Sequence, residues 1–199
     1  MAGNNGKEIR VAGTGRVLIA PSGTDAPANA TDNWGTEWTD LGYTTTDGIK
    51  FNKKDKIDPV DTWQSVSPAR FIYSDRDLTV KFQLLQLNKA NLAFFMGGGA
   101  VTVTAPAEPP TVLAEDLKEF SYDLAHTPAP DERALGIEFT DGAAKYRFVI
   151  PRGQVTETEE ISLTRTGAVK LGVTFTALAK NDQSALASFR IKELSSSYS

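Results

Sequence analysis

The sequence predicts a mainly β fold with one short helix. Apolar and polar residues alternate along several segments, and turn-forming pairs such as Asp47–Gly48 and Asp141–Gly142 interrupt them. Helical spacing of apolar residues occurs clearly at one place only. The chain has 199 residues, 40% of them hydrophobic, which suits one large domain with a substantial core. Such a chain must pair or protect the edges of its sheet.

The clearest strand runs from Asp77 to Leu87 and leads directly into the helix. Its apolar residues alternate with polar ones, which is typical of a strand with one buried face. Asn88 then offers a side-chain oxygen as helix N-cap, and Gly97 suits the left-handed position after the last turn. The pattern predicts a helix from Asn88 to Met96.

The segments before this strand include two strand regions and two loops. Residues 1–14 contain several glycines and no sustained periodicity, so we expect a flexible N-terminal arm. The short apolar run Arg16–Ala20 predicts a strand that a proline ends. A polar loop rich in turn formers follows, and Trp38–Tyr43 and Ile49–Phe51 form the next strand region.

Residues 52–67 combine charges of both signs with few apolar residues, and we expect a long loop there. A solvated loop is the simplest interpretation. The alternative is a loop that docks on another surface, since long loops in compact domains are usually functional or disordered. Trp63 favours the docking loop, because an aromatic side chain in a mobile loop is costly unless something buries it.

The second half of the chain predicts further strands around one irregular connection. A strand at Ala69–Tyr73 precedes the long one, and Val101–Thr104 follows the helix. Residues 104–132 are rich in proline and predict an irregular connection, with a helical turn around Ala114–Phe120. His126 in this connection is expected to be an exposed loop residue.

Residues 134–151 predict a hairpin around Asp141–Gly142. After a turn at Arg152–Gly153, a strand continues through residues 154–167, and Val169–Leu178 closes the sheet before a C-terminal extension, residues 181–199. If Ile161 and Leu163 point inward, small polar residues line the other face of these strands: Thr156, Thr158, Glu160, Ser162, Thr164, Thr174 and Thr176. An ordinary solvated face has the same composition, and a one-residue slip exchanges the two faces.

The composition argues against an enzyme. There is no cysteine and only one histidine, which excludes disulfides, thiolate catalysis and most histidine-based metal or triad chemistry. The glycine pairs and triplets lack the remaining residues of nucleotide-binding loops, and the carboxylates Glu157 and Glu159 lie on a strand, where such groups normally only solubilise it. We therefore expect no catalytic residue, no cofactor and no bound metal.

Charge and hydropathy exclude two further classes of partner. The net charge is −4, which argues against a protein that holds nucleic acid by its phosphates. No segment approaches the roughly 20 apolar residues needed to cross a bilayer, and the first residues carry no apolar signal core. We expect a soluble protein that does not enter a membrane.

The order of several motifs resembles the major tail tube proteins of long, non-contractile-tailed phages (the siphophage type), and most closely those of phages infecting actinobacteria. The resemblance covers residues 13–180 and rests on these segments: GTGRVLIAPSGTDAP, WTDLGYTTTDGIKF, DTWQSVSPAR, DLTVKFQLLQLN, FFMGGGAV, DERALGIEFTDGAAKYRFVIPRGQVTETEEISLTR and VTFTALA. It implies a β-sandwich or barrel of two packed antiparallel sheets with one flanking α-helix, residues 15–180.

The resemblance also implies an assembly. Copies would join into hexameric rings around an inner β-barrel, and the rings would stack into a tube around the tape measure protein, between tail terminator and tail tip proteins. DNA would later pass through the tube without sticking. The location would be the virion tail, assembled in the bacterial host cytoplasm. By position, the long loop would contact the next ring through Lys53, Lys54, Asp55, Asp58, Asp61 and Trp63, and the polar face would line the lumen.

Three alternatives belong to other classes. A monomeric β-sandwich that binds carbohydrate or a receptor needs a concave aromatic platform, whereas Trp34, Trp38 and Trp63 fall in separate regions. The inner tube of a contractile injection system shares the architecture and differs by its sheath partner. A hydrolase would require turnover that depends on Glu157 or Glu159.

Overall fold

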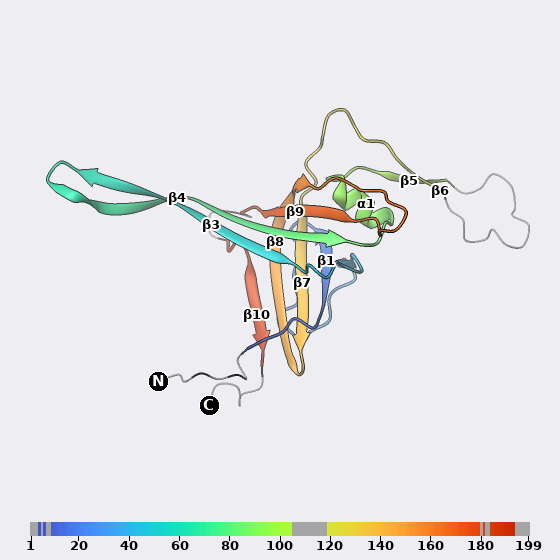
Figure 1. The fold of residues 1–199 in the computed structure, drawn as a ribbon, viewed down its shortest axis with the longest axis horizontal. Coiled ribbons are helices and arrows are strands. Elements are labelled where there is room, and N and C mark those ends of the chain that lie inside the picture. The colour runs from blue at the N-terminus through green and yellow to red at the C-terminus, as the bar shows by residue number, and fades with distance from the viewer. Residues whose placement is uncertain are drawn as a thin grey trace, which may run out of the picture.

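The computed structural model describes residues 9–104, 119–179 and 184–193, together with residues 4, 6 and 181. Within them the fold is mainly β, with two antiparallel sheets and one short helix, as the sequence predicts (Figure 1). The elements are β1 (Thr14–Pro21), β2 (Thr39–Asp40), β3 (Lys50–Thr62), β4 (Ser65–Leu84), α1 (Lys89–Phe95), β5 (Val101–Thr104), β6 (Glu119–Tyr122), β7 (Arg133–Asp141), β8 (Ala144–Thr158), β9 (Leu171–Ala177) and β10 (Ser188–Lys192).

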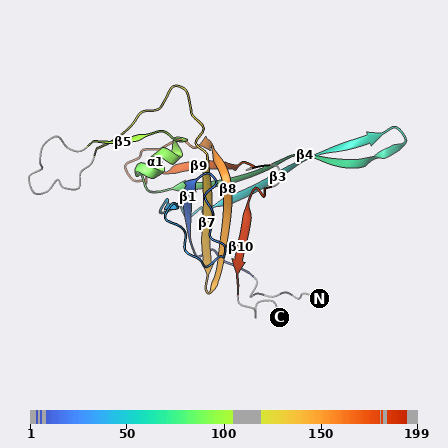
Figure 2. The same cartoon turned by 180° about the vertical axis from the view of Figure 1, so that it is seen from behind.

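The larger sheet folds over its own core. Its strands follow the order β2-β1-β7-β8-β9-β4-β3, and β10 pairs with the first half of β8. β3, β4 and β9 run across β1, β7, β8 and β10 in both views (Figures 1 and 2). Side chains from both halves, among them Val17, Phe82, Leu135, Ile150 and Phe175, form one buried cluster. One continuous sheet thus supplies both layers of a sandwich.

β8 joins the two layers because it changes partners along its length. Residues 145–149 pair with β10, and residues 153–158 pair with β9. The change occurs at Gly153, where a Cβ atom would lie 2.4 Å from the Phe175 ring and 2.5 Å from the Thr176 carbonyl oxygen. Only glycine allows the backbones to approach this closely.

The helix forms as predicted. The side chain of Asn88 caps it by accepting a hydrogen bond from the Asn91 backbone N–H at 2.9 Å, and Gly97 after its end has φ +77°. Asn91 is fully buried, and its Nδ2 donates to the carbonyl oxygens of Leu41 and Gln86, each at 2.8 Å. These bonds hold α1 against the sheet.

Two expected elements differ from the structure. The strand predicted through residues 154–167 ends at Thr158. The Glu159 N–H still donates to the Gly172 carbonyl oxygen at 2.9 Å, but β9 begins at Leu171 and does not extend beside the residues that follow. The connection expected to be irregular at residues 104–132 contains β6, which pairs with β5 to form the second sheet. The helical turn expected around Ala114–Phe120 lies largely outside the described residues.

A buried ion pair fixes the loop of residues 22–38 over the outer face of β1, β7 and β8. The Arg147 side chain is 1% exposed, and its Nε and Nη2 donate to Glu138 Oε2 at 3.1 and 2.5 Å. Its other N–H groups donate to the carbonyl oxygens of Asn29 and Asp32 in this loop. The guanidinium also lies 4.4 Å from the centre of the Trp34 ring.

We predict that Glu138→Gln destabilises the folded protein. The substitution removes the only carboxylate that Arg147 contacts among the described residues and leaves a buried cation uncompensated. Breaking such a pair costs about 3–5 kcal/mol of unfolding free energy, measurable by chemical denaturation. Glu157→Gln is the control, because its 3.8 Å pair with Lys81 is exposed and contributes under about 1 kcal/mol.

The same pair predicts a pH dependence. Burial acts to raise the pKa of Glu138, but the hydrogen bond and charge of Arg147, with smaller effects of Arg16 and the Trp34 N–H, outweigh it and lower that pKa. A carboxylate with a lowered pKa stabilises the folded state at pH values above its ordinary pKa. This stabilisation is lost as the pH falls through the lowered pKa. The stability difference between wild type and Glu138→Gln should therefore shrink in acid, and a constant difference would contradict this.

Candidate assembly surfaces

The segment expected to be a long loop, residues 52–67, belongs to a long β-hairpin. β3 and β4 pair from Lys50 and Lys81 out to Thr62 and Ser65, and beyond the core they project from the body of the molecule (Figure 1). The expectation of a loop is wrong, because apolar residues of β3 pair with apolar residues of β4. Register shifts in this pairing disturb the alternation of apolar and polar residues, so the sequence pattern does not indicate strands here.

All six residues predicted for inter-ring contact lie on this hairpin. Trp63 is at its tip and is 98% exposed. Lys53 and Asp55 are paired within the chain: Asp55 lies 2.6 Å from Lys53 Nζ, and Arg76 Nε and Nη2 donate to its two oxygens at 2.8 and 3.2 Å. Lys54, Asp58 and Asp61 lie exposed along the same strand. The sequence does not predict Arg76 here, because it falls between the two separate strands expected at Ala69–Tyr73 and Asp77–Leu87, whereas β4 is continuous.

The outer part of the hairpin's core-side face is apolar and exposed, beyond the ion network of Lys53, Asp55 and Arg76 on the same face. Ile57 pairs with Tyr73, and Pro59 pairs with Phe71, on the face that carries Phe51 and Val80 nearer the core. Phe71 and Tyr73 are 59% and 65% exposed. The opposite face is mixed, with lysines and aspartates beside Val60 and Ile72. A sheet face of this kind is typical of an interaction surface.

A second surface is the polar face of the four strands β8, β9, β4 and β3. Thr156 and Thr176 share a hydrogen bond between their hydroxyl groups at 2.8 Å, and Thr156 also donates to the Thr174 carbonyl oxygen at 3.3 Å. Gln83 donates to Glu159 at 2.5 Å on the same face. The structure thus brings together three of the seven residues predicted there: Thr156, Thr174 and Thr176.

A β-bulge changes the rest of that prediction. The register shifts between Val155 and Glu157, so that Glu157 lies opposite Thr174, whereas Thr158 lies opposite the buried Val173. The carboxylates Glu157 and Glu159 therefore take the places on this face that the sequence pattern gave to Thr158 and Glu160. Ser162 and Thr164 lie in the exposed segment after β8, outside any strand, as do Ile161 and Leu163, which were expected to point inward.

The polar face has an open strand edge on each side. β3 is the last strand of the sheet path, and its outer edge pairs with no strand among the described residues. On the other side, β8 pairs with β7 only as far as Gly153, so residues 154–158 have β9 on one side and no described strand on the other. Open edges pair readily with other chains.

A family model described as phage tail tube protein matches residues 1–199. The chain belongs to this family. A comparison with curated proteins finds no match. Membership confirms the tail tube resemblance, and it makes this tail tube protein a structural component of the virion tail that assembles with itself into a tube.

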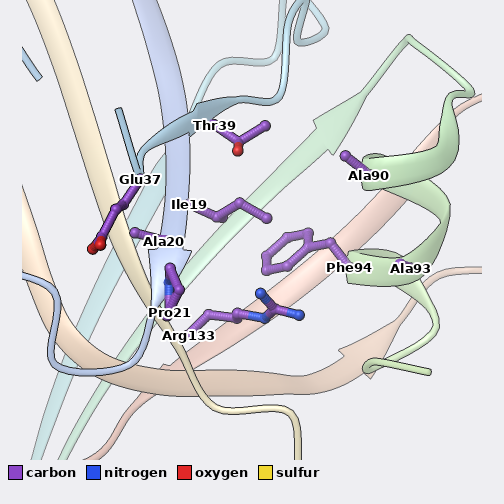
Figure 3. Close-up of a pocket in the computed structure, with 9 residues that line it drawn as sticks. All are labelled: Ile19, Ala20, Pro21, Glu37, Thr39, Ala90, Ala93, Phe94 and Arg133. Atoms are coloured by element: carbon purple, nitrogen blue, oxygen red, sulfur yellow. The ribbon is translucent and has the colours of Figure 1, made fainter. Parts of the chain in front are cut away.

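The tail tube protein also has a small cavity of about 150 Å³ between β1, β2 and α1 (Figure 3). Apolar residues such as Ile19 and Phe94 line it, and its two charged residues are Glu37 and Arg133. Arg133 is already paired with Asp131 at 2.8 Å. In the part of the chain that the structure describes, no three acidic, histidine or cysteine side chains gather as a metal site. Nor is any described helix long and apolar enough to cross a membrane.

We predict that Asp55→Asn loosens the hairpin of this tail tube protein. The hydrogen bonds of Arg76 and, to a lesser extent, those of Lys53 lower the pKa of Asp55, so that its charge bridges β3 and β4 at neutral pH. Without that charge, hydrogen exchange of amides 57–73 should accelerate several-fold. Asp58→Asn is the matched control and should leave the rates unchanged; equal acceleration in both variants would contradict the bridge.

Proposed function

We propose that copies of this protein close into hexameric rings and that the rings stack into the tail tube of a long, non-contractile-tailed phage of the siphophage type. The proposal includes a closest likeness to the tail tube proteins of actinobacterial phages, assembly in the host cytoplasm and passage of the genome through the tube. A tape measure protein inside the tube and terminator and tip proteins at its ends are the expected partners. The observation that carries it is the polar four-stranded face with an open edge on each side.

Ring closure follows from the two open edges. The outer edge of β3 in one copy is free to pair with residues 154–158 of the next copy, which extends the four-stranded sheet from subunit to subunit. The two edges differ, so the contact between copies is head-to-tail. Such a contact forms a closed ring when the rotation from each copy to the next adds up to a full turn. Closure would satisfy every edge that borders the polar face.

The polar face then forms the wall of the lumen. Lys81 pairs with Glu157 at 3.8 Å, and the threonine cluster of Thr156, Thr174 and Thr176 offers no positive charge. Counterion release by phosphate contacts drives DNA binding. The lysines of this face stand among carboxylates, since Lys54 and Lys56 lie opposite Asp77 and Asp75 in register. DNA would pass such a wall without being held.

The hairpin is the proposed contact between rings. Its tip carries Trp63 and its core-side face carries Phe71 and Tyr73, and all three are exposed in the single chain. Buried aromatic anchors dominate the affinity of interfaces, whereas rim charges mainly set register. Lys54, Asp58 and Asp61 supply these charges, since Lys53 and Asp55 are paired internally.

A carbohydrate- or receptor-binding module has less support from the tryptophans. Trp34 and Trp38 pack against each other with ring centres 4.6 Å apart, and they cover buried residues of β1, β7 and β8. Trp38 is 7% exposed. The tryptophans therefore form no exposed platform.

The first test is negative-stain electron microscopy of the purified protein over a concentration series, with light scattering. We expect hollow tubes or stacked rings with a central lumen and six-fold averages. Solid filaments without a lumen would contradict the hollow tube, and rings of another symmetry would contradict the hexamer. A monomer at all concentrations would count against self-assembly.

We predict that Trp63→Ala weakens stacking and leaves the fold intact. A central aromatic anchor contributes about 2 kcal/mol or more, so the concentration needed for tubes should rise at least about 10-fold. Tyr43→Ala is the matched control, since Tyr43 is a 75% exposed aromatic residue away from the hairpin. Normal polymerisation of Trp63→Ala would remove the anchor.

A further inference from the structure

An apolar groove lies beside the base of the hairpin and is distinct from the polar face. Its volume is about 660 Å³, within the roughly 300–1,000 Å³ of ligand pockets. Its apolar lining comes from β3, β4, β10 and the segment before β10, namely Phe51, Leu78, Leu186, Ala187 and Phe189. Two cations, Lys53 and Arg76, lie beside these residues, with smaller residues between them.

The groove is a place where the aromatic core reaches the surface. The ring centres of Phe51 and Phe189 lie 4.4 and 4.3 Å from that of Phe148, which is buried. Phe51 is 43% exposed and Phe189 is 68% exposed, so both rings touch the core and remain partly uncovered by the described residues. Further aromatic or aliphatic side chains would extend this cluster.

The hairpin of the same chain does not fill the groove. Phe51 and Leu78 of its base form part of the lining, and continuous pairing of β3 with β4 holds the tip away from the body (Figures 1 and 2). Trp63 at that tip is 98% exposed and is therefore available to another molecule. A second copy of the chain has both the tip and the groove.

Charge favours the tip of a second copy as the occupant. Lys53 and Arg76 beside the groove share one carboxylate, Asp55, which leaves an excess positive charge there. The outer part of the hairpin carries Asp58 and Asp61 against Arg70, an excess negative charge. Unlike charges at the rim of an apolar contact favour one partner and one register.

We propose that this groove receives the hairpin tip of a second copy, with Trp63 and Val66 against Phe51 and Phe189. The inference rests on the proposed function, because it names the receptor for the stacking hairpin. The tip and the groove are different surfaces, so the contact is heterologous and propagates. One end of the tube then presents free tips, and the other presents free grooves. Proteins that close the two ends meet different surfaces.

Cysteine cross-linking tests the contact directly, because the chain contains no cysteine of its own. Gln64→Cys at the tip and Ala185→Cys at the groove are combined in one chain, which keeps Trp63 in place. Mild oxidation of the assembled protein should give a ladder of covalent oligomers. Gln64→Cys with Thr31→Cys, on the exposed loop of residues 22–38, is the control and should give none.

A double-mutant cycle separates this inference from the proposed function. Phe189→Ser should raise the tube-forming concentration about 10-fold, like Trp63→Ala, and the double variant should lose little more, because both remove one contact. Thermal melting checks that each variant folds. Tubes of the Gln64→Cys, Ala185→Cys variant that give no ladder, or fully additive effects of Trp63→Ala and Phe189→Ser, would overturn the groove contact and leave the tube intact. Failure of wild type to assemble would overturn the proposed function itself.

Discussion

The antiparallel pairing of β3 with β4 is the constraint on which the rest of the structure depends. Near the core it places Val80 among the buried side chains, and farther out it carries Trp63 away from the body. Because side chains alternate along a strand, the two faces of the pair stay distinct over this length. The core-side face of the hairpin continues the core face, first through the ion network of Lys53, Asp55 and Arg76 and then through apolar residues. The opposite, mixed face continues the polar surface of β9 and β8. The core thus sets the direction in which both assembly surfaces point.

The sequence predicted the elements that local chemistry specifies, such as the helix capped by Asn88 and the hairpin at Asp141–Gly142. It could not predict the bulge between Val155 and Glu157, because a bulge is a relation between β8 and its partner. That one extra residue moved the predicted polar face from Thr158 to Glu157. The long hairpin was missed for a related reason: register shifts break the alternation, and high charge is typical of loops.

The buried Arg147 shows how one face of the sheet is closed by the chain itself. A buried cation is costly unless its N–H groups are bonded, and here a carboxylate, two backbone carbonyls and the Trp34 ring contact it. In return it fixes residues 29 and 32 over β7 and β8. The opposite arrangement holds at Phe51 and Phe189, where no described segment of the chain covers the rings. The fold seals one side and leaves the other available to a partner.

The internal ion pairs affect how many cations a tube subunit can offer to DNA phosphates. Lys81 is paired with Glu157, and Lys53 and Arg76 share Asp55, so each of these cations already contacts a carboxylate before any partner arrives. Surface pairs of this kind add little stability, but they reduce the number of cations available to phosphates. With a net charge of −4, a wall built from such subunits repels DNA overall. Stacking must then rely on apolar contact rather than on net attraction between like-charged rings, and the exposed aromatic residues of the hairpin supply that contact.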